Sequence, residues 1–275
     1  MNIFTGLLPE TPEDRAKWRS EQSALPVCSG REVEETLFDE PPDWMRIENQ
    51  GQTNSCAPNA GTSVVEKVHY MKTGKVIQLC RNYLYLRGQQ MCGIRGDNGC
   101  TLGGIIAALK KYGVCPEELW AFNQTYQTRM PAGCDEAAKP NLVTHTLDVE
   151  STGYQGFRTV IGQNVGGVLM AYTYPCNFWQ GYIVERYQPT GEGGHAVAGM
   201  FLASRKDSKG RPYVWVGNSH SLAAQRKGWQ CWSPDAIDEL IESDEWGATG
   251  VTDMETPEPR EVDWSGANNP FRAKE

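Results

Sequence analysis

The apolar residues of this chain change their spacing near residue 140. Before that point they recur every three or four positions, as on one face of an α-helix. The clearest series is Ala57, Ala60, Val64, Val65, Val68 and Met71. After that point, short β-branched and aromatic stretches alternate with glycine, proline and asparagine turns, which is typical of strands. A helical half followed by a strand-rich half favours an α+β fold with two subdomains over a βαβ sheet.

The same patterns divide the chain into four segments. We expect an N-terminal extension over 1–42, a helical subdomain over 43–140, a β-rich subdomain over 141–246 and an extended, Pro- and acid-rich tail over 247–275. Strands are expected in the β-rich subdomain at 143–149, 166–174, 181–187, 195–203 and 213–218.

Helix boundaries can be predicted from capping residues. Thr11, Thr101 and Ser233 each precede a helical pattern and are good N-caps. Glycine suits the position after a helix, so Gly74 and Gly88 predict where the first two helices of the helical subdomain end.

Composition excludes several classes of partner. The 275 residues carry 26 basic and 34 acidic side chains, a net charge of −8, and the basic residues form no cluster, so we expect no nucleic-acid partner. No apolar run reaches the length of about 18 residues that a membrane span needs. The first residues lack the basic and apolar regions of a signal peptide, so none is expected.

Nine cysteines make an odd number, which disfavours a closed disulfide framework and favours reduced thiols. None of them forms a C-x-x-C pair, and we expect no metal and no cofactor. Cys56 is set apart because it begins a predicted helix, with Pro58 in the first turn. The positive end of a helix dipole favours a thiolate, so we expect a lowered pKa for this thiol.

A thiolate nucleophile needs a base, and the chain has four histidines. His69 falls inside a helix, His145 inside a strand and His220 in a turn, where structural roles are common. His195 follows a glycine-rich loop and opens an apolar strand, a rigid but reachable position. Asn218 ends another strand and could accept a hydrogen bond from an imidazole.

Taken in order, these segments resemble the papain-like cysteine peptidase family over about 43–232. NQGQTNSC at 49–56, GHAV at 194–197 and NS at 218–219 are similar to the three family blocks around nucleophile, base and orienting Asn. The 139 residues between Cys and His match the family's spacing of roughly 130–150. KYGVCPE at 111–117 and FWQG at 178–181 resemble bacterial and phage-type branches.

The resemblance implies a thiol protease, a hydrolase that cleaves peptide bonds through a thioester acyl-enzyme. Cys56 would be the nucleophile, His195 the acid and base, and Asn218 the residue that orients the imidazole. Gln50 would form the oxyanion hole together with the backbone N–H of Cys56.

The family fold implied is a helical left subdomain and a β-barrel-like right subdomain with the active-site cleft between them. Gly103 and Gly104 would correspond to the glycines of the substrate groove.

The chain departs from the family pattern at several positions. Ala57 and His220 stand where the family usually has tryptophan, and the second of these tryptophans shields the His–Asn bond from water. Thr53 stands where the family has the disulfide partner of Cys100. Only 55 residues precede Cys56, fewer than in the usual inhibitory prodomain. Activity is therefore either unchecked, or 1–42 or 247–275 cover the cleft.

Three functions remain open from the sequence. The first is a peptidase that acts on a peptide or protein substrate. The second is a papain-fold structural or interaction protein with weak or no activity, such as a phage virion component, whose terminal arms bind neighbouring proteins. The third is a hydrolase of cell-wall or isopeptide amide bonds. The location expected is cytoplasmic or virion-associated, without contact with a membrane.

Overall fold

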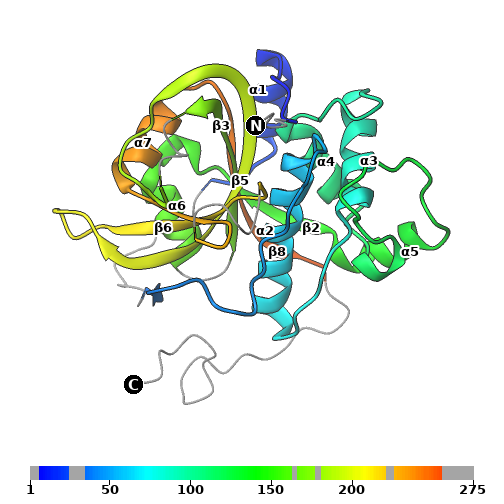
Figure 1. Cartoon of the computed structure of the whole chain (residues 1–275), viewed down its shortest axis with the longest axis horizontal. Helices are drawn as coiled ribbons and strands as arrows, with labels where there is room; N and C mark the ends of the chain where they lie inside the picture. Colours follow the sequence, from blue (N-terminus) through cyan, green and yellow to red (C-terminus); the bar gives the residue numbers. More distant parts are fainter. Residues whose placement is uncertain (1–5, 25–34, 163–165, 177–180, 221–225, 256–275) are drawn as a thin grey trace.

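The computed structural model of the chain describes residues 6–24, 35–162, 166–176, 181–220 and 226–255. The helices are α1 Pro12–Ser20, α2 Cys56–Thr73, α3 Arg81–Cys92, α4 Leu102–Lys111, α5 Cys134–Ala138, α6 Tyr154–Gly162 and α7 Pro234–Glu242. The strands are β1 Leu37–Phe38, β2 Val143–Leu147, β3 Gly167–Cys176, β4 Ile183–Val184, β5 Pro189–Lys206, β6 Pro212–Gly217, β7 Trp229–Trp232 and β8 Ala248–Met254. Helices precede most of the strands, and the α+β prediction is confirmed (Figure 1).

Three helices begin where the capping residues predict. The hydroxyls of Thr11, Thr101 and Ser233 accept a hydrogen bond from the backbone N–H three residues later, at 3.0–3.1 Å. Each hydroxyl satisfies an N–H that has no partner inside the helix. Gly74 ends α2 in the left-handed conformation, with φ of 67°. None of the described helices is long and apolar enough to cross a lipid bilayer.

The predicted end of a helix at Gly88 is wrong, because α3 continues to Cys92. A Cβ atom at position 88 would lie 2.6 Å from Cδ1 of Ile105 in α4, so this glycine lets the two helices approach closely. Gly93, with φ of 70°, ends the helix instead.

The strands form one sheet in the order β2-β8-β3-β5-β6-β7-β4, and β1 pairs with β5 outside this path. Neighbours along the path are antiparallel except β4 and β7, and β1 is parallel to β5. The described strands leave the sheet open at β2 and β4. It is therefore not a closed barrel, while the papain-like fold class holds.

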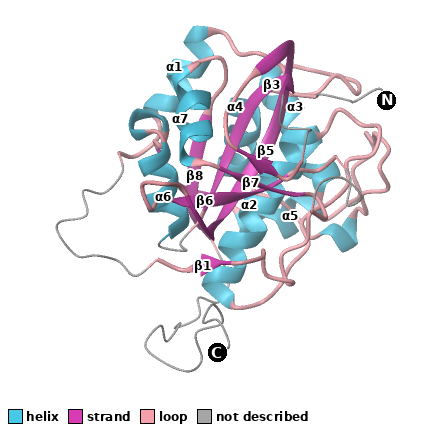
Figure 2. Cartoon of the chain, turned by 60° about the vertical axis from the view of Figure 1, so that its left-hand side comes forward, coloured by secondary structure: helices cyan, strands magenta, loops and turns pink. Residues whose placement is uncertain are grey.

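The sheet has an apolar core on each face, because successive side chains of a strand point to opposite sides. Leu169 and Ala196 belong to the core that contains the apolar residues of α2, α3 and α4. Val168 and Val197, their neighbours along β3 and β5, belong to the core beneath α6 and α7. Figure 2 shows α6 and α7 on one side of the sheet and α3 and α5 on the other.

Two elements fall where the sequence predicts something else. Helix α6 lies inside the β-rich segment, and β8 lies inside the predicted tail, paired with β2 and β3. Small residues give β8 a weak strand pattern, yet Gly250 lets it pack on α6: a Cβ there would lie 2.9 Å from Val160. The rest of the predicted tail, 256–275, lies outside the described residues, as does 25–34 of the predicted extension.

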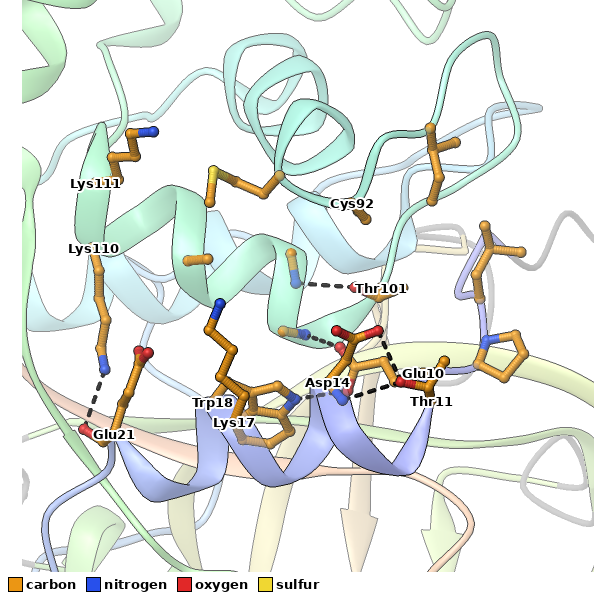
Figure 3. Close-up of a pocket in the computed structure, with 17 residues that line it drawn as sticks. Glu10, Thr11, Asp14, Lys17, Trp18, Glu21, Cys92, Thr101, Lys110 and Lys111 are labelled. Carbon is orange, nitrogen blue, oxygen red and sulfur yellow. Dashed lines mark hydrogen bonds between the residues drawn. The ribbon is translucent and has the colours of Figure 1, made fainter.

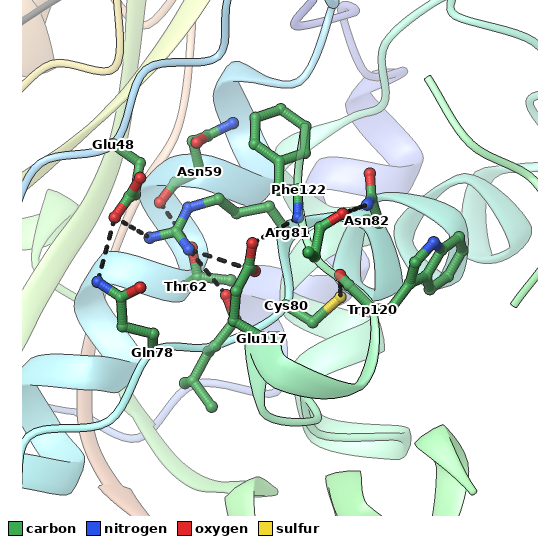
Figure 4. Close-up of polar contacts among 12 residues, drawn as sticks. Glu48, Asn59, Thr62, Gln78, Cys80, Arg81, Asn82, Glu117, Trp120 and Phe122 are labelled. Carbon is green, nitrogen blue, oxygen red and sulfur yellow. Dashed lines mark hydrogen bonds and ion pairs between the residues drawn. The ribbon is translucent and has the colours of Figure 1, made fainter. Parts of the chain in front are cut away.

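A buried arginine anchors the segment that leads to Cys56. The side chain of Arg81 in α3 is 1% exposed and lies 3.3 Å from Glu66 of α2, 3.6 Å from Glu117 and 3.7 Å from Glu48 (Figure 4). Glu48 comes two residues before Gln50, so this ion-pair cluster holds the start of the 49–56 loop against α2 and α3.

Candidate active site

Cys56 is the first residue of α2 and is fully buried where that helix meets the sheet. The backbone amides of Ala196 and Gly6 donate toward its sulfur and favour the thiolate, but burial outweighs them and raises the pKa of the thiol to about 11. The lowered pKa expected from the helix dipole is therefore absent in this arrangement. Desolvation of a charge in a dry site exceeds the effect of a few aligned dipoles.

His195 and Asn218 come from neighbouring strands and are both fully buried. Strands β5 and β6 pair Ala198 with Gly217, and this antiparallel register brings His195 level with the residues that follow β6. Nε2 of His195 lies 3.1 Å from Oδ1 of Asn218. An amide oxygen only accepts, so Nε2 carries the hydrogen and Nδ1 of the neutral ring holds the lone pair.

Ala196 links the surroundings of the Cys56 thiol to those of the His195 imidazole. This residue follows His195 in β5, and its backbone amide is one of four that donate toward the sulfur of Cys56. The structure thus gathers Cys56, His195 and Asn218 at one junction between α2 and the sheet.

Gln50 belongs to the same junction and is fully buried. Its backbone N–H donates to the carbonyl of Ser219, and its Oε1 accepts from the hydroxyl of Ser219, both at 2.8 Å. Its Nε2 donates to the carbonyl of Thr53 at 2.9 Å. The side-chain amide therefore ties the 49–56 loop to the residue that follows Asn218.

Gly103 and Gly104 lie in the first turn of α4, against the N-terminal extension. Glu10 accepts from the backbone N–H of Gly103 at 2.6 Å and from the indole of Trp18 at 2.7 Å. Figure 3 shows Glu10 and Trp18 in the pocket between α1 and α4. A Cβ at position 103 would collide with the Trp18 ring, so the extension packs directly on Gly103, whereas a Cβ at Gly104 would lie 2.6 Å from the sulfur of Cys92. Their role in a substrate groove stays a prediction.

The sequence does not single out residues 6–8, which we call the strap. The N–H of Leu7 donates to the carbonyl of Gly194 in β5 at 3.3 Å. The N–H of Leu8 donates to the carbonyl of Cys100 at 3.0 Å. In turn, the N–H of Cys100 donates to the carbonyl of Gly6, also at 3.0 Å. Leu7 is only 3% exposed. The strap thus lies between the start of α4 and the strand that carries His195, and its Gly6 amide reaches Cys56.

His220 lies against the imidazole of His195. Its Nε2 is 3.2 Å from Nδ1 of His195, and the ring centroids are 4.1 Å apart with a tilt of 33°. Burial lowers the pKa of His220 to about 4. Burial also lowers the pKa of His195 well below its usual value, the charge of His220 acts in the same direction, and Asn218 opposes both. Both imidazoles are therefore neutral near pH 7.

Within the described ranges, no group of three or more His, Cys, Asp or Glu side chains is arranged to hold a metal ion. Seven free thiols are described, and six of them are buried. Cys56 begins α2, and the backbone amide that follows His195 in β5 donates toward its sulfur.

No protein-family model and no curated protein sequence matches the chain. Solved structures do. Xylellain, a cysteine protease from Xylella fastidiosa, superposes with a TM-score of 0.69 at 19% identity, over 92% of this chain and 96% of its own. Bromelain from Ananas comosus in complex with E64 gives 0.58 at 16% identity, over 77% and 98%. The Carica candamarcensis cysteine protease CMS1MS2 in complex with E-64 gives 0.56 at 14%, over 80% and 94%. The chain therefore has the papain-like fold.

Proposed function

We propose that this chain is a papain-like cysteine peptidase with Cys56 as nucleophile, His195 as acid and base, and Asn218 as the residue that orients the imidazole. The observation that carries the proposal is the 3.1 Å contact between Nε2 of His195 and Oδ1 of Asn218, beside a cysteine at a helix N-terminus. This tautomer places the lone pair of the ring on Nδ1, the atom that would take the proton of Cys56 and that lies 3.2 Å from Nε2 of His220.

The reaction follows from these atoms. Nδ1 of His195 takes the proton of Cys56, and the sulfur attacks the carbonyl carbon of the scissile bond. The imidazolium returns that proton to the leaving amine, which gives a thioester. Water, deprotonated by the same nitrogen, then hydrolyses the thioester. Nε2 of Gln50, released from Thr53, and the N–H of Cys56 hold the oxyanion.

The arrangement described here is the closed form of this enzyme. The strap is hydrogen-bonded to Gly194 on one side and to Cys100 on the other, and the backbone amide of Gly6 donates toward the thiol of Cys56. The fully buried, neutral Cys56 cannot meet a substrate until the strap leaves. The N-terminal extension is thus the segment that restrains activity.

Displacing the strap tests both parts of the proposal. A Cβ at Gly6 would collide with the carbonyl oxygen of Asn54, so Gly6→Val should expel the strap. We expect this variant to cleave a fluorogenic peptide library faster than the wild type, and the second change Cys56→Ala to abolish cleavage. Pro9→Ala, at an exposed residue of the same segment, is the matched control. A folded Gly6→Val variant that cleaves none of the peptides would contradict the proposal.

One observation favours the second function, a papain-fold structural or interaction protein. Nδ1 of His195 is already engaged by His220 rather than by a thiol. A chain that uses the fold only for binding would show no peptide cleavage with the strap displaced, and its arms would bind protein neighbours.

We also propose an origin and two alternative settings for this chain. KYGVCPE at 111–117 supports a bacterial or phage-type origin, and a phage virion is one setting that suits it. Most of the other motif of this kind, 178–180, lies outside the described residues. A hydrolase of cell-wall or isopeptide amides would use the same chemistry on a different substrate.

A further inference from the structure

The base of this site already has a hydrogen-bond partner on its reactive nitrogen. Because Nε2–H of His195 donates to Asn218, the lone pair of the neutral ring is on Nδ1. Nε2 of His220 lies 3.2 Å from this atom. Two lone pairs facing each other would repel, so the hydrogen between the two rings belongs to Nε2 of His220.

His220 is held in place from three sides. Its backbone N–H lies 3.3 Å from Oδ1 of Asn218, the same atom that accepts from His195. Its ring lies against His195 of β5 at a tilt of 33°, and the ring of Tyr174 in β3 lies 6.1 Å away between centroids. Among the described residues, an imidazole of β5, a phenol of β3 and an amide of the loop after β6 thus face His220. A tryptophan here would cover the same face without a donor in this position.

We propose that His220 is a positioning residue that blocks the base. Its Nε2–H donates a hydrogen bond to Nδ1 of His195, and Cys56 can give up its proton to this atom only after that bond breaks. The inference rests on the proposed function, since it concerns the proton transfer that starts that reaction. Release requires the ring of His220 to turn away or its hydrogen to move to Nδ1. His220 thus adds a second restraint that is independent of the strap.

The charge of the pair follows from the same contact. Two buried imidazoles with nitrogens 3.2 Å apart cannot both be cationic without strong repulsion. Once His195 takes the proton of Cys56, a His220 ring that has moved its hydrogen to Nδ1 would compete with the thiolate for the new N–H. Removing the imidazole at position 220 should therefore favour the thiolate–imidazolium pair.

The hydrogen positions can be observed directly. In full-length protein with ¹⁵N-labelled histidine, long-range ¹H–¹⁵N spectra at pH 7 should show both rings in the Nε2–H tautomer, with the Nδ1 resonance of His195 shifted by an accepted hydrogen bond. His220→Phe should move that resonance, and the control His145→Phe should not. A His220 ring in the Nδ1–H tautomer, or an unmoved His195 resonance in His220→Phe, would overturn the proposal.

A kinetic experiment distinguishes blocking of Nδ1 by a hydrogen bond from simple shielding of the His195 ring. In the Gly6→Val background, alkylation of Cys56 by iodoacetamide should be about three- to tenfold faster with His220→Phe, the range expected for one lost hydrogen bond. His220→Gln, which keeps an N–H donor, should restore the slower rate.

Equal alkylation rates with His220 and with His220→Phe, while Cys56 is still alkylated, would overturn the blocking role of His220 and leave the proposed function intact. If Cys56 is alkylated no faster than the other thiols in every variant, both fail.

Discussion

At the scale of single residues, Gln50 offers the sharpest test of the oxyanion hole. Its Nε2, which donates to the carbonyl of Thr53 in this structure, is the side-chain donor that we propose for the oxyanion. Gln50→Ala should lower kcat by about 10²–10³, because one oxyanion donor is lost, while KM changes little. The measurement is steady-state peptide cleavage in the Gly6→Val background.

Ser219→Ala is the matched control for this variant. It removes the hydroxyl that donates to Oε1 of Gln50 but leaves the Nε2 donor in place. A change of less than tenfold is expected. Equal losses in the two variants would assign Gln50 to holding the loop rather than to the oxyanion.

The pKa of Cys56 predicts how its reactivity depends on pH. Burial under the strap raises the pKa of this thiol to about 11, so the thiolate fraction of the wild type grows roughly tenfold per pH unit between 7 and 10. Alkylation should follow that slope. In Gly6→Val the thiol is open to water and to the imidazole, and its rate should be nearly flat over the same range. Parallel profiles for the two proteins would disprove the effect of the strap.

Residue identities at the site could be predicted from local motifs, whereas their ionisation could not. Cys56, His195 and Asn218 stand in short blocks that the chain itself displays. The neutral state of the thiol depends on its complete burial, which is set by the packing of distant segments such as residues 6–8 and β5. The contact between His220 and His195 depends on the register of β5 and β6, which a sequence pattern does not give.

At the scale of secondary-structure elements, Arg81 joins α3 to α2 and to the loop of Gln50. Arg81→Met would leave the buried Glu66 without its cation, and we expect a loss of about 3–5 kcal/mol in the free energy of unfolding. Burial raises the pKa of Glu66 to about 7 even with Arg81 present, so the variant should bury a protonated acid. Urea denaturation measures the change.

Arg46→Met is the control for this element. Arg46 also pairs with a glutamate, Glu48 at 3.2 Å, but its side chain is 61% exposed. An exposed ion pair contributes little, so the loss should stay below about 1 kcal/mol. Similar losses for Arg46→Met and Arg81→Met would mean that burial does not set the strength of this cluster.

Elements with a strong local pattern were predictable, and those defined by packing were not. The caps at Thr11, Thr101 and Ser233 act within one turn, so the sequence locates them. Gly88 reads locally as a helix end, but its function is to admit Ile105 of the next helix. Strand β8 has small residues whose contacts with α6 and two strands decide its conformation.

At the scale of the whole molecule, the N-terminal extension connects the two halves of the fold. Glu10 and Trp18 bind α4 of the helical half, and the strap pairs with Cys100 on one side and Gly194 on the other. A substrate that binds between Cys100 and Gly194, as we propose, would therefore need the space that the strap occupies. The sequence alone allowed either terminus to cover the cleft, and among the described residues, residues 6–8 lie between Cys100 and Gly194.

The most direct test of this account is to find which cysteine of the Gly6→Val protein reacts with E-64, an epoxide that alkylates papain-type thiolates. Mass spectrometry of the digested protein should find one adduct, on Cys56, among the nine cysteines. The adduct should be lost in His195→Ala and form more slowly in the strapped wild type. No adduct on Cys56, or equal labelling of several cysteines, would contradict the account.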